Sequence, residues 1–270
     1  MADNNDEPRF AKEKHLERRL RLVETRDRML RKDRSEERAA FEEVFDRSTL
    51  MTVYELMNMG EIEDIYGVVK AGKESRIYWG KAPNGEELAI KIYLTVSAEF
   101  RKGMLPYIVG DPRFKDVKRD SRSLVYTWAQ KELKNLQAAY EASVRVPKPV
   151  TVKNNILLME FIGEKGISAP LMKEVELKNP KQIFRKLLTS VKKLYEGAKL
   201  VHGDLSEYNV MIWKGEPVIF DLSQSVALEH PNAKQFLLRD LENLHRYFKK
   251  LAVTVPSVEE MVRRATGEQV

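Results

Sequence analysis

The stretch VHGDLSEYN, residues 201–209, decides the fold assignment of this chain. Asp204 follows His202 by two residues, and Asn209 comes five residues later, with apolar runs on both sides. A carboxylate and an amide at this interval can serve one site, the acid by accepting a proton and the amide by holding a metal ion. The alternative is a polar turn between two strands, because short motifs also arise by chance. The rest of the sequence has to decide between these two interpretations.

A lysine upstream lies in a strand-like run. Lys91 has apolar neighbours on both sides in residues 87–93, and a buried ammonium group is costly unless it is paired. The letters Ala-Ile-Lys match the end of V-A-I-K, which places the phosphate-binding lysine of protein kinases. The alternative is an edge-strand lysine that reaches water. The expected helix 123–142 offers Glu132 as its partner, ahead of Glu141, because the helix dipole disfavours a carboxylate in the last turn.

An acid downstream completes the pattern. Asp221 closes the second strand of the expected hairpin 210–220, twelve residues after Asn209. In protein kinases an acid after such a hairpin binds Mg²⁺ together with the catalytic-loop Asn. An acid at a strand exit is ordinary by itself, but Asp and Asn at this paired spacing are not. Together these residues favour the interpretation as a phosphoryl-transfer site.

The elements around these residues follow from local patterns. We expect a short helix with Ser48 or Thr49 as its N-cap and Gly60 as its stop. Three strands should follow at 66–71, 75–81 and 87–93, the last two joined by an Asn-Gly turn. Two further strands should flank Asn154-Asn155, and a helix should begin at Asn179-Pro180 and end at Gly197.

The glycine-containing turn of residues 67–75 comes close to the P-loop pattern G-x-x-x-x-G-K-[ST]. Glu74, however, occupies the hydroxyl position, and Ser75 comes one residue late. A P-loop must also open into a helix, whereas the sequence after Ser75 is rich in strand-forming residues. We therefore reject a P-loop and expect a turn between two strands.

Composition excludes several classes of protein. The chain has 270 residues, 43% of them hydrophobic, which suffices for one large or one bilobal domain. It has no cysteine and only four histidines, so disulfides, thiolate metal sites and a structural zinc are not expected. No apolar run approaches a membrane span, and the N-terminus does not look like a signal peptide, so we expect a cytoplasmic protein.

The N-terminal segment 9–38 carries twelve Lys or Arg against seven Asp or Glu. Leu16, Leu20, Val23 and Leu30 give it a narrow apolar stripe at helical spacing. Either it is a solvated helix packed on the main body, or it is an arm that lies on nucleic-acid phosphates. The mixture of charges favours the packed helix, because pairing at i,i+4 spacing explains many of them.

These motifs together resemble the RIO family of atypical protein kinases, and its type-1 branch most closely. The resemblance extends from about Thr49 to Phe248. It rests on five motifs: GKES at 72–75, AIKIY at 89–93, TWAQKELKNL at 127–136, HGDLSEYN at 202–209 and FDLSQS at 220–225. The long insert before the Trp-x-x-Lys-Glu helix is what indicates type 1.

The resemblance implies an α+β, bilobal protein-kinase-like fold. A small antiparallel-sheet N-lobe would span 48–163, with an insert at 94–122, and a truncated helical C-lobe would span 164–255. A charged helical extension, 1–47, would precede them, and a tail, 256–270, would follow.

The resemblance also implies roles for single residues. ATP would lie between the lobes, with Mg²⁺, or Mn²⁺ in its place. Lys91 would contact the phosphates and Glu132 would hold it, while Lys73 and Ser75 would cover the phosphates. The backbone of Glu160 and Ile162 would meet the adenine. Asp204 would be the base, and Asn209 and Asp221 would bind the metal.

Further properties of the family would carry over with these roles. An aspartyl-phosphate would form at Asp221, and Ser121 or Ser123 would be autophosphorylated. The pre-ribosomal small subunit, both RNA and protein, would be the partner, in agreement with the basic N-terminal segment.

Departures from ordinary protein kinases restrict this interpretation. Gly203 replaces the usual Arg, no Gly follows Phe220-Asp221-Leu222 as in D-F-G, and 49 residues after Asp221 leave little room for a peptide-docking platform. Small-molecule phosphotransferases of the aminoglycoside and choline kinase type also use H-G-D-x-x-x-x-N. They are the alternative enzyme, and a ribosome-binding scaffold with ATP as a mere ligand is the alternative outside catalysis.

Overall fold

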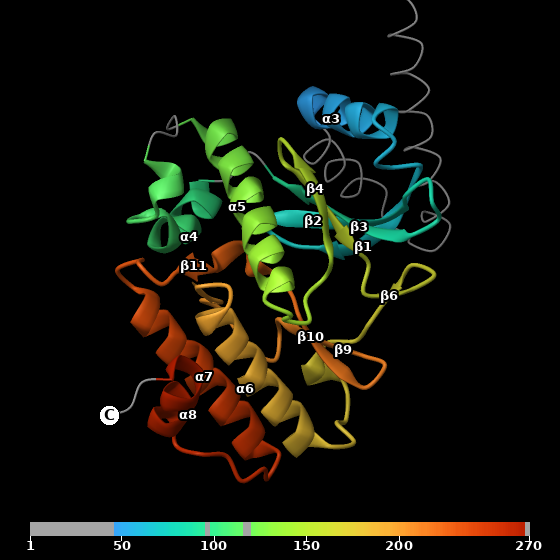
Figure 1. Ribbon diagram of the computed structural model, residues 1–270. Helices are drawn as coiled ribbons and strands as arrows, with labels where there is room; N and C mark the ends of the chain where they lie inside the picture. The colour runs from blue at the N-terminus through green and yellow to red at the C-terminus, as the bar shows by residue number, and fades with distance from the viewer. Residues whose placement is uncertain (1–45, 95–97, 116–119, 268–270) are drawn as a thin grey trace, which may run out of the picture.

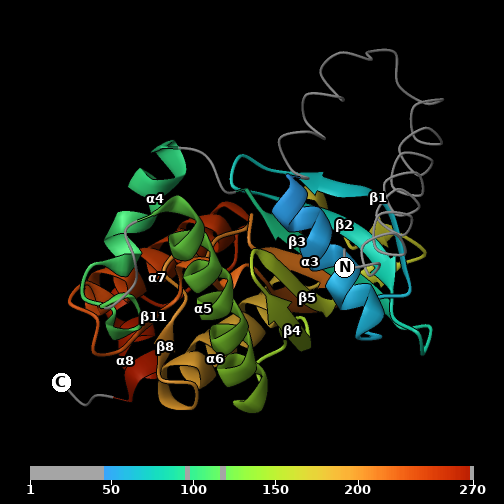
Figure 2. The same ribbon diagram turned by 90° about the horizontal axis from the view of Figure 1, so that it is seen from above.

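The computed structural model describes residues 46–94, 98–115 and 120–267. Within these ranges a β-sheet lies on one side of the molecule and most helices on the other, while helix α5 (Ser121–Glu141) runs beside both (Figures 1 and 2). The expected helix at residues 9–38 lies outside the described residues. No helix in the part of the chain that the structure describes is long and apolar enough to cross a membrane.

Five antiparallel strands form the main sheet in the order β1-β2-β3-β5-β4. Their bounds are β1 (Asp64–Ala71), β2 (Ser75–Lys81), β3 (Glu87–Tyr93), β4 (Pro149–Lys153) and β5 (Ile156–Glu160). The sequence predicted β2 and β3 to the residue, and β1 begins two residues earlier than expected. Gly85, at φ +83°, makes the predicted turn between β2 and β3. The central position of β3 explains why six of its seven residues are buried.

Helix α3 (Arg47–Asn58) packs against the sheet and shows one wrong expectation. Its N-cap is Asp46, whose side chain accepts from the Thr49 N–H at 2.7 Å, and not Ser48 or Thr49. Asp46 has extended backbone, as an N-cap requires, whereas Ser48 lies within the helix and its hydroxyl contacts Tyr126. Gly60 follows the last turn with φ +74°, close to the expected stop.

The insert, residues 94–122, contains more regular structure than the sequence suggested. It forms helix α4 (Ala98–Ile108) and the short 3₁₀ helix η1 (Pro112–Phe114), both ahead of α5. Helix α5 begins at Ser121, two residues before the expected start, because the Asp120 carboxylate caps it by accepting from the Ser123 N–H. Phe114 and Trp128 pack together, so the insert shares the core with α5.

Three helices form the other side of the molecule: α6 (Pro180–Glu196), α7 (Ala233–Lys250) and α8 (Val258–Thr266). Helix α6 has the predicted cap, Asn179, and ends at Gly197 as expected. Residues 258–266, expected as part of a tail, are instead a helix that buries Met261 and Ala265 against α6 and α7. The short elements are β6 (Gly163–Glu164), β7 (Ile167–Ser168), η2 (Met172–Glu174), β8 (Leu200–Val201), β9 (Val210–Trp213), β10 (Glu216–Ile219), η3 (Leu222–Gln224) and β11 (Val226–Ala227).

The pairing of short strands positions the two polar loops. β8 pairs with β11 and β9 pairs with β10, so both ends of residues 202–209 and both ends of residues 220–225 are held by strands. These two loops therefore lie side by side, below the sheet that carries Lys91.

Candidate active site

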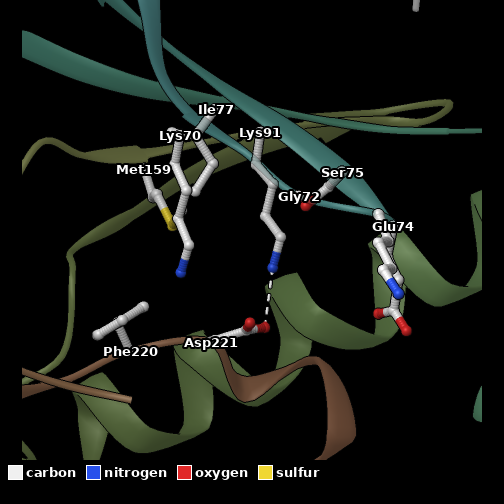
Figure 3. Close-up of a pocket in the computed structure, with 10 residues that line it drawn as sticks. Lys70, Gly72, Glu74, Ser75, Ile77, Lys91, Met159, Phe220 and Asp221 are labelled. Atoms are coloured by element: carbon white, nitrogen blue, oxygen red, sulfur yellow. Dashed lines mark hydrogen bonds and ion pairs between the residues drawn. The ribbon is translucent and has the colours of Figure 1, made fainter. Parts of the chain in front are cut away.

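Lys91 lies at the centre of a buried group of charges. Its Nζ donates to Glu132 Oε1 and to Asp221 Oδ1, at 2.9 Å in both cases. Glu132 is fully buried and also accepts from the Tyr93 hydroxyl. Glu141 is exposed at the end of α5, so the structure brings the first-choice carboxylate to Lys91 and not the second. A lysine on β3, an acid on α5 and an acid before η3 thus meet at one point. Figure 3 shows the pair of Lys91 and Asp221.

The charges of this group depend on one another. Burial alone would lower the pKa of Lys91, but Asp221 and Glu132 raise it well above its usual value. Burial opposes the charged form of Asp221, yet Lys91 and the Ser223 hydroxyl, 2.8 Å from Oδ1, hold the pKa of Asp221 well below its usual range. Burial raises the pKa of Glu132 although Lys91 opposes it. The group therefore holds Lys91 as a cation and Asp221 as a carboxylate.

Asp204 and Asn209 are joined directly. The Asn209 side-chain amide donates to the Asp204 backbone carbonyl at 2.7 Å and to Asp204 Oδ2 at 3.0 Å. Since Nδ2 faces Asp204, the amide oxygen of Asn209 is left to face a ligand. Burial, and then the charge of Asp221, raise the pKa of Asp204, although the Asn209 hydrogen bond opposes this. A raised pKa suits a carboxylate that accepts a proton near neutral pH.

The loop around Asp204 is held by a residue that the sequence did not single out. The buried Asp240 of α7 accepts from the N–H groups of Gly203 and Leu205, at 2.8 Å each, and Arg239 donates to the Gly203 carbonyl. Burial raises the pKa of Asp240 to about 7, against the two N–H groups. Only the folded structure reveals the role of Asp240, because 36 residues separate it from Asp204 in the sequence.

Gly203 itself cannot be replaced freely. Its φ is +81°, and a Cβ there would lie 2.9 Å from the Gln224 carbonyl oxygen and 3.5 Å from Tyr107. The absence of the usual Arg is therefore a consequence of close packing between this loop, the loop after Asp221 and helix α4.

A cavity of about 290 Å³ opens between the sheet and the loop at Asp221. Gly72, Lys73 and Ser75 line it, and Lys73 and Ser75 are the residues expected to cover phosphates. Glu74 of the same GKES motif lines it as well, and so does Lys70, which the sequence did not single out. Strand register explains Lys70: it lies opposite Ile77, which lies opposite Lys91, so all three side chains share the cleft face (Figure 3).

The residues expected to meet adenine lie at the end of β5, just after the cavity residue Met159. The Glu160 side chain points elsewhere, since Arg145 binds it through two nitrogens at 2.8 Å each. The Ile162 carbonyl accepts from the Ala169 N–H at 2.8 Å. Glu160 and Ile162 are not among the described residues that line the cavity, and the contact of their backbone with adenine stays a prediction.

His202 connects the two polar loops. Its Nδ1 accepts from the Asp204 N–H at 3.3 Å, and its Nε2 donates to the Phe220 carbonyl at 3.2 Å. One acceptor and one donor require the neutral imidazole, because the imidazolium has two donors. Burial lowers the pKa of His202 to about 4, in agreement with this neutral form.

This geometry predicts acid sensitivity. Between pH 6.5 and about 4 the unfolded chain binds a proton on His202 that the folded protein does not, so stability falls as pH falls through this range. The loss should reach about 3 kcal/mol. Urea unfolding of wild type and His202→Gln at pH 7 and pH 4.5 measures it, since the other titrating groups are common to both proteins. An equal loss in the two proteins would contradict the prediction.

The sheet, the helices and the buried charges between them define a kinase-like phosphotransferase fold. The match to the RIO domain covers residues 76–261. The chain is 38% identical to the RIO-type serine/threonine-protein kinase Rio1 of Haloferax volcanii over 227 residues, 83% of this chain and 78% of that one. It is also 38% identical to Rio1 of Methanocaldococcus jannaschii over 229 residues, 84% and 77% of the two chains.

Human RIO1 is 36% identical over 88% of this chain, which corresponds to 42% of the human protein. The chain therefore belongs to the RIO family of serine/threonine protein kinases, in its Rio1 branch. The crystal structure of a Rio2 kinase complex with ADP, Mg²⁺ and phosphoaspartate from Chaetomium thermophilum has the same fold. It superposes with a TM-score of 0.61 at 21% identity, over 81% of this chain and 66% of that one.

Proposed function

We propose that this protein transfers the γ-phosphoryl group of ATP in an Mg²⁺-dependent reaction, with Asp204 as the base and Asn209 and Asp221 as metal ligands. The observation that carries the proposal has two parts. Lys91 and Asp221 pair with each other and line one cavity. The loop of the Asp204–Asn209 pair lies beside Asp221, since the Phe220 N–H donates to the Asn209 carbonyl at 3.1 Å, and burial and then the charge of Asp221 raise the pKa of Asp204. Lys91, freed from Asp221 by a nucleotide, would bind its phosphates and remain held by Glu132. Lys73 and Ser75 would cover the phosphates from the turn above.

The residues present suit a hard cation that is shared with phosphate. The Asp221 side chain is 38% exposed and its carboxylate oxygens face the cavity. In the described ranges, no group of three or more His, Cys, Asp or Glu is gathered to hold a metal alone. Mg²⁺ usually binds one or two carboxylates and completes its shell with phosphate oxygens and water, which matches this donor set. When bound, the metal neutralises charge that develops on the phosphates, and Mn²⁺ would serve in its place.

The acceptor can be a hydroxyl or Asp221 itself. With a serine hydroxyl, Asp204 takes the proton as the oxygen attacks phosphorus and ADP leaves; Ser121 or Ser123, in the first turn of α5, would be such acceptors within the chain. With Asp221, a carboxylate oxygen attacks phosphorus, ADP leaves, and an aspartyl-phosphate remains. Water then hydrolyses the aspartyl-phosphate while Asp204 takes its proton. The Rio2 structure with phosphoaspartate supports the second route by kinship.

The biological setting follows from the family alone. We infer that the protein acts in maturation of the small ribosomal subunit, with pre-ribosomal RNA and protein as partners. The kinship with Rio1 proteins favours this over a small-molecule phosphotransferase or a scaffold that binds ATP without turnover.

Labelled ATP tests the chemistry. Wild type should acquire label that hydroxylamine removes, from Asp221, or label stable to acid, from Ser121 or Ser123. Asp204→Asn should slow formation of acid-stable label by about 10² to 10⁴-fold, because a positioned base contributes that much. Glu242→Gln, which changes an exposed acid on α7, is the matched control and should label as wild type does.

Two results would contradict the proposal. Wild-type turnover in Asp204→Asn would show that Asp204 is not the base. Phosphate transfer to added choline or an aminoglycoside, with no label on protein and no free phosphate, would favour the small-molecule enzyme.

A further inference from the structure

The backbone that follows Asp221 is held by two buried side chains of α5. Lys131 Nζ donates to the Ser223 carbonyl at 2.6 Å. Asn135 Nδ2 donates to the carbonyls of Leu222 and Ser225, at 2.9 and 3.0 Å. Both side chains are 1% exposed, so these carbonyls have donors where water is excluded. Four residues apart, Lys131 and Asn135 lie on one face of α5, with Glu132 beside them.

This contact controls where the Asp221 carboxylate lies. Asp221 has φ +61° and ψ +65°. Residues other than glycine adopt this left-handed backbone conformation with strain. The 3₁₀ turn η3 that follows is held by strand pairing at the ends of its loop, and between those ends Lys131 and Asn135 supply side-chain donors to its carbonyls. One helix therefore places both partners of Lys91: Glu132 directly, and Asp221 through the loop.

Arg113 of the insert fixes the orientation of the Asn135 side-chain amide. Arg113 Nη1 donates to Asn135 Oδ1 at 2.9 Å. An amide whose oxygen accepts from Arg113 must turn its NH₂ toward the two loop carbonyls. Arg113 is itself held by Asp111, which accepts from Nε and Nη2 at 2.6 to 3.0 Å. A chain of hydrogen bonds thus runs from the insert through Asn135 to the residues after Asp221.

We propose that Lys131 and Asn135 are positioning residues for Asp221, and that Arg113 makes the insert part of the metal site. This inference rests on the proposed function, in which Asp221 binds the metal. Groups that orient a metal ligand from behind typically change metal affinity by 10 to 100-fold when they are removed. A measurement of metal affinity should therefore detect the removal of Lys131, Asn135 or Arg113.

Equilibrium binding of ADP to the full-length protein tests the inference. The ratio of ADP affinity in MgCl₂ to that in EDTA measures what the metal contributes. Lys131→Met and Asn135→Leu should lower this ratio by about 10-fold or more, with little change in EDTA. Arg113→Met should lower it by roughly 5-fold, the value of one hydrogen bond. Lys131→Arg should retain most of the ratio, since it keeps a donor.

Lys134→Met is the matched control, because Lys134 lies on α5 but is exposed. It should behave as wild type. Urea unfolding of each variant separates a loss of stability from a loss of positioning. The inference would be overturned if the variants lose stability but keep the wild-type ratio of ADP affinity in MgCl₂ to that in EDTA.

Two further outcomes keep the test decisive. If Asn135→Leu does not fold, Arg113→Met decides, because the Arg113 side chain is 24% exposed and its removal leaves the loop donors in place. If wild type itself gains no affinity from MgCl₂, the proposed metal site fails and this inference fails with it. A wild-type gain that all variants share overturns only the positioning roles.

Discussion

Asp221→Asn should reduce Mg²⁺-dependent turnover by at least about 10³-fold, because it removes the charge that holds the metal at the phosphates. Asparagine is the informative substitution here. It keeps an oxygen for the Ser223 hydroxyl and tolerates the left-handed backbone, φ +61°, better than alanine would. The fold should therefore survive while the chemistry is lost. Phosphate release measured against Mg²⁺ concentration reports both effects.

The same variant separates two roles of this carboxylate. As a metal ligand, Asp221 contributes to binding of Mg·ADP, which calorimetry measures. As a phosphate acceptor, it contributes hydroxylamine-sensitive label. Turnover within a few-fold of wild type would refute the metal assignment, whereas normal Mg·ADP binding without label would leave Asp221 with the acceptor role alone.

Lys91→Met should lower both activity and stability. Activity should fall by about 10² to 10³-fold, as expected when a donor to the reacting phosphates is removed. Stability should fall by roughly 3 to 5 kcal/mol, because Glu132 is 0% exposed and would be left as an uncompensated buried charge. The free energy of unfolding in urea at pH 7 measures the second effect.

A double variant distinguishes these effects. Lys91→Met with Glu132→Gln removes both charges and keeps an acceptor for the Tyr93 hydroxyl, so stability should return toward wild type while activity stays low. Lys70→Met, on the same cleft face but exposed, should leave stability unchanged. Equal stability of Lys91→Met and wild type would show that the buried pair does not carry the expected energy.

Local patterns predicted the strands of the main sheet, the hairpin β9–β10 and both ends of α6, because hydrophobic alternation, Asn-Gly turns and Asn-Pro helix starts act over a few residues. Helices α4, α7 and α8 were not predicted. The motif residues could also be predicted from the sequence, some from an unusual charge in an apolar run and others from the spacing of Asp204, Asn209 and Asp221. Lys91 on an apolar strand is the clearest case.

The residues that hold the site residues in place could not be predicted in the same way. Asp240, Asn135 and Arg113 matter because of the backbone groups that they reach, and those groups come from distant parts of the chain. The cap of α3 was wrong for a related reason: Asp46, Ser48 and Thr49 are all good caps, and only the packing of Ser48 against Tyr126 selects between them. No helix was predicted within the insert, because its order comes from contacts with α5 and α7.

The close packing around Gly203 restricts the order in which mutations can accumulate. Arginine at this position, as in ordinary protein kinases, would meet the Gln224 backbone and Tyr107 at once, on a backbone that disfavours any side chain. A lineage could acquire that arginine only after α4 and the loop after Asp221 had moved apart. Position 203 and the loop after Asp221 can therefore change only together.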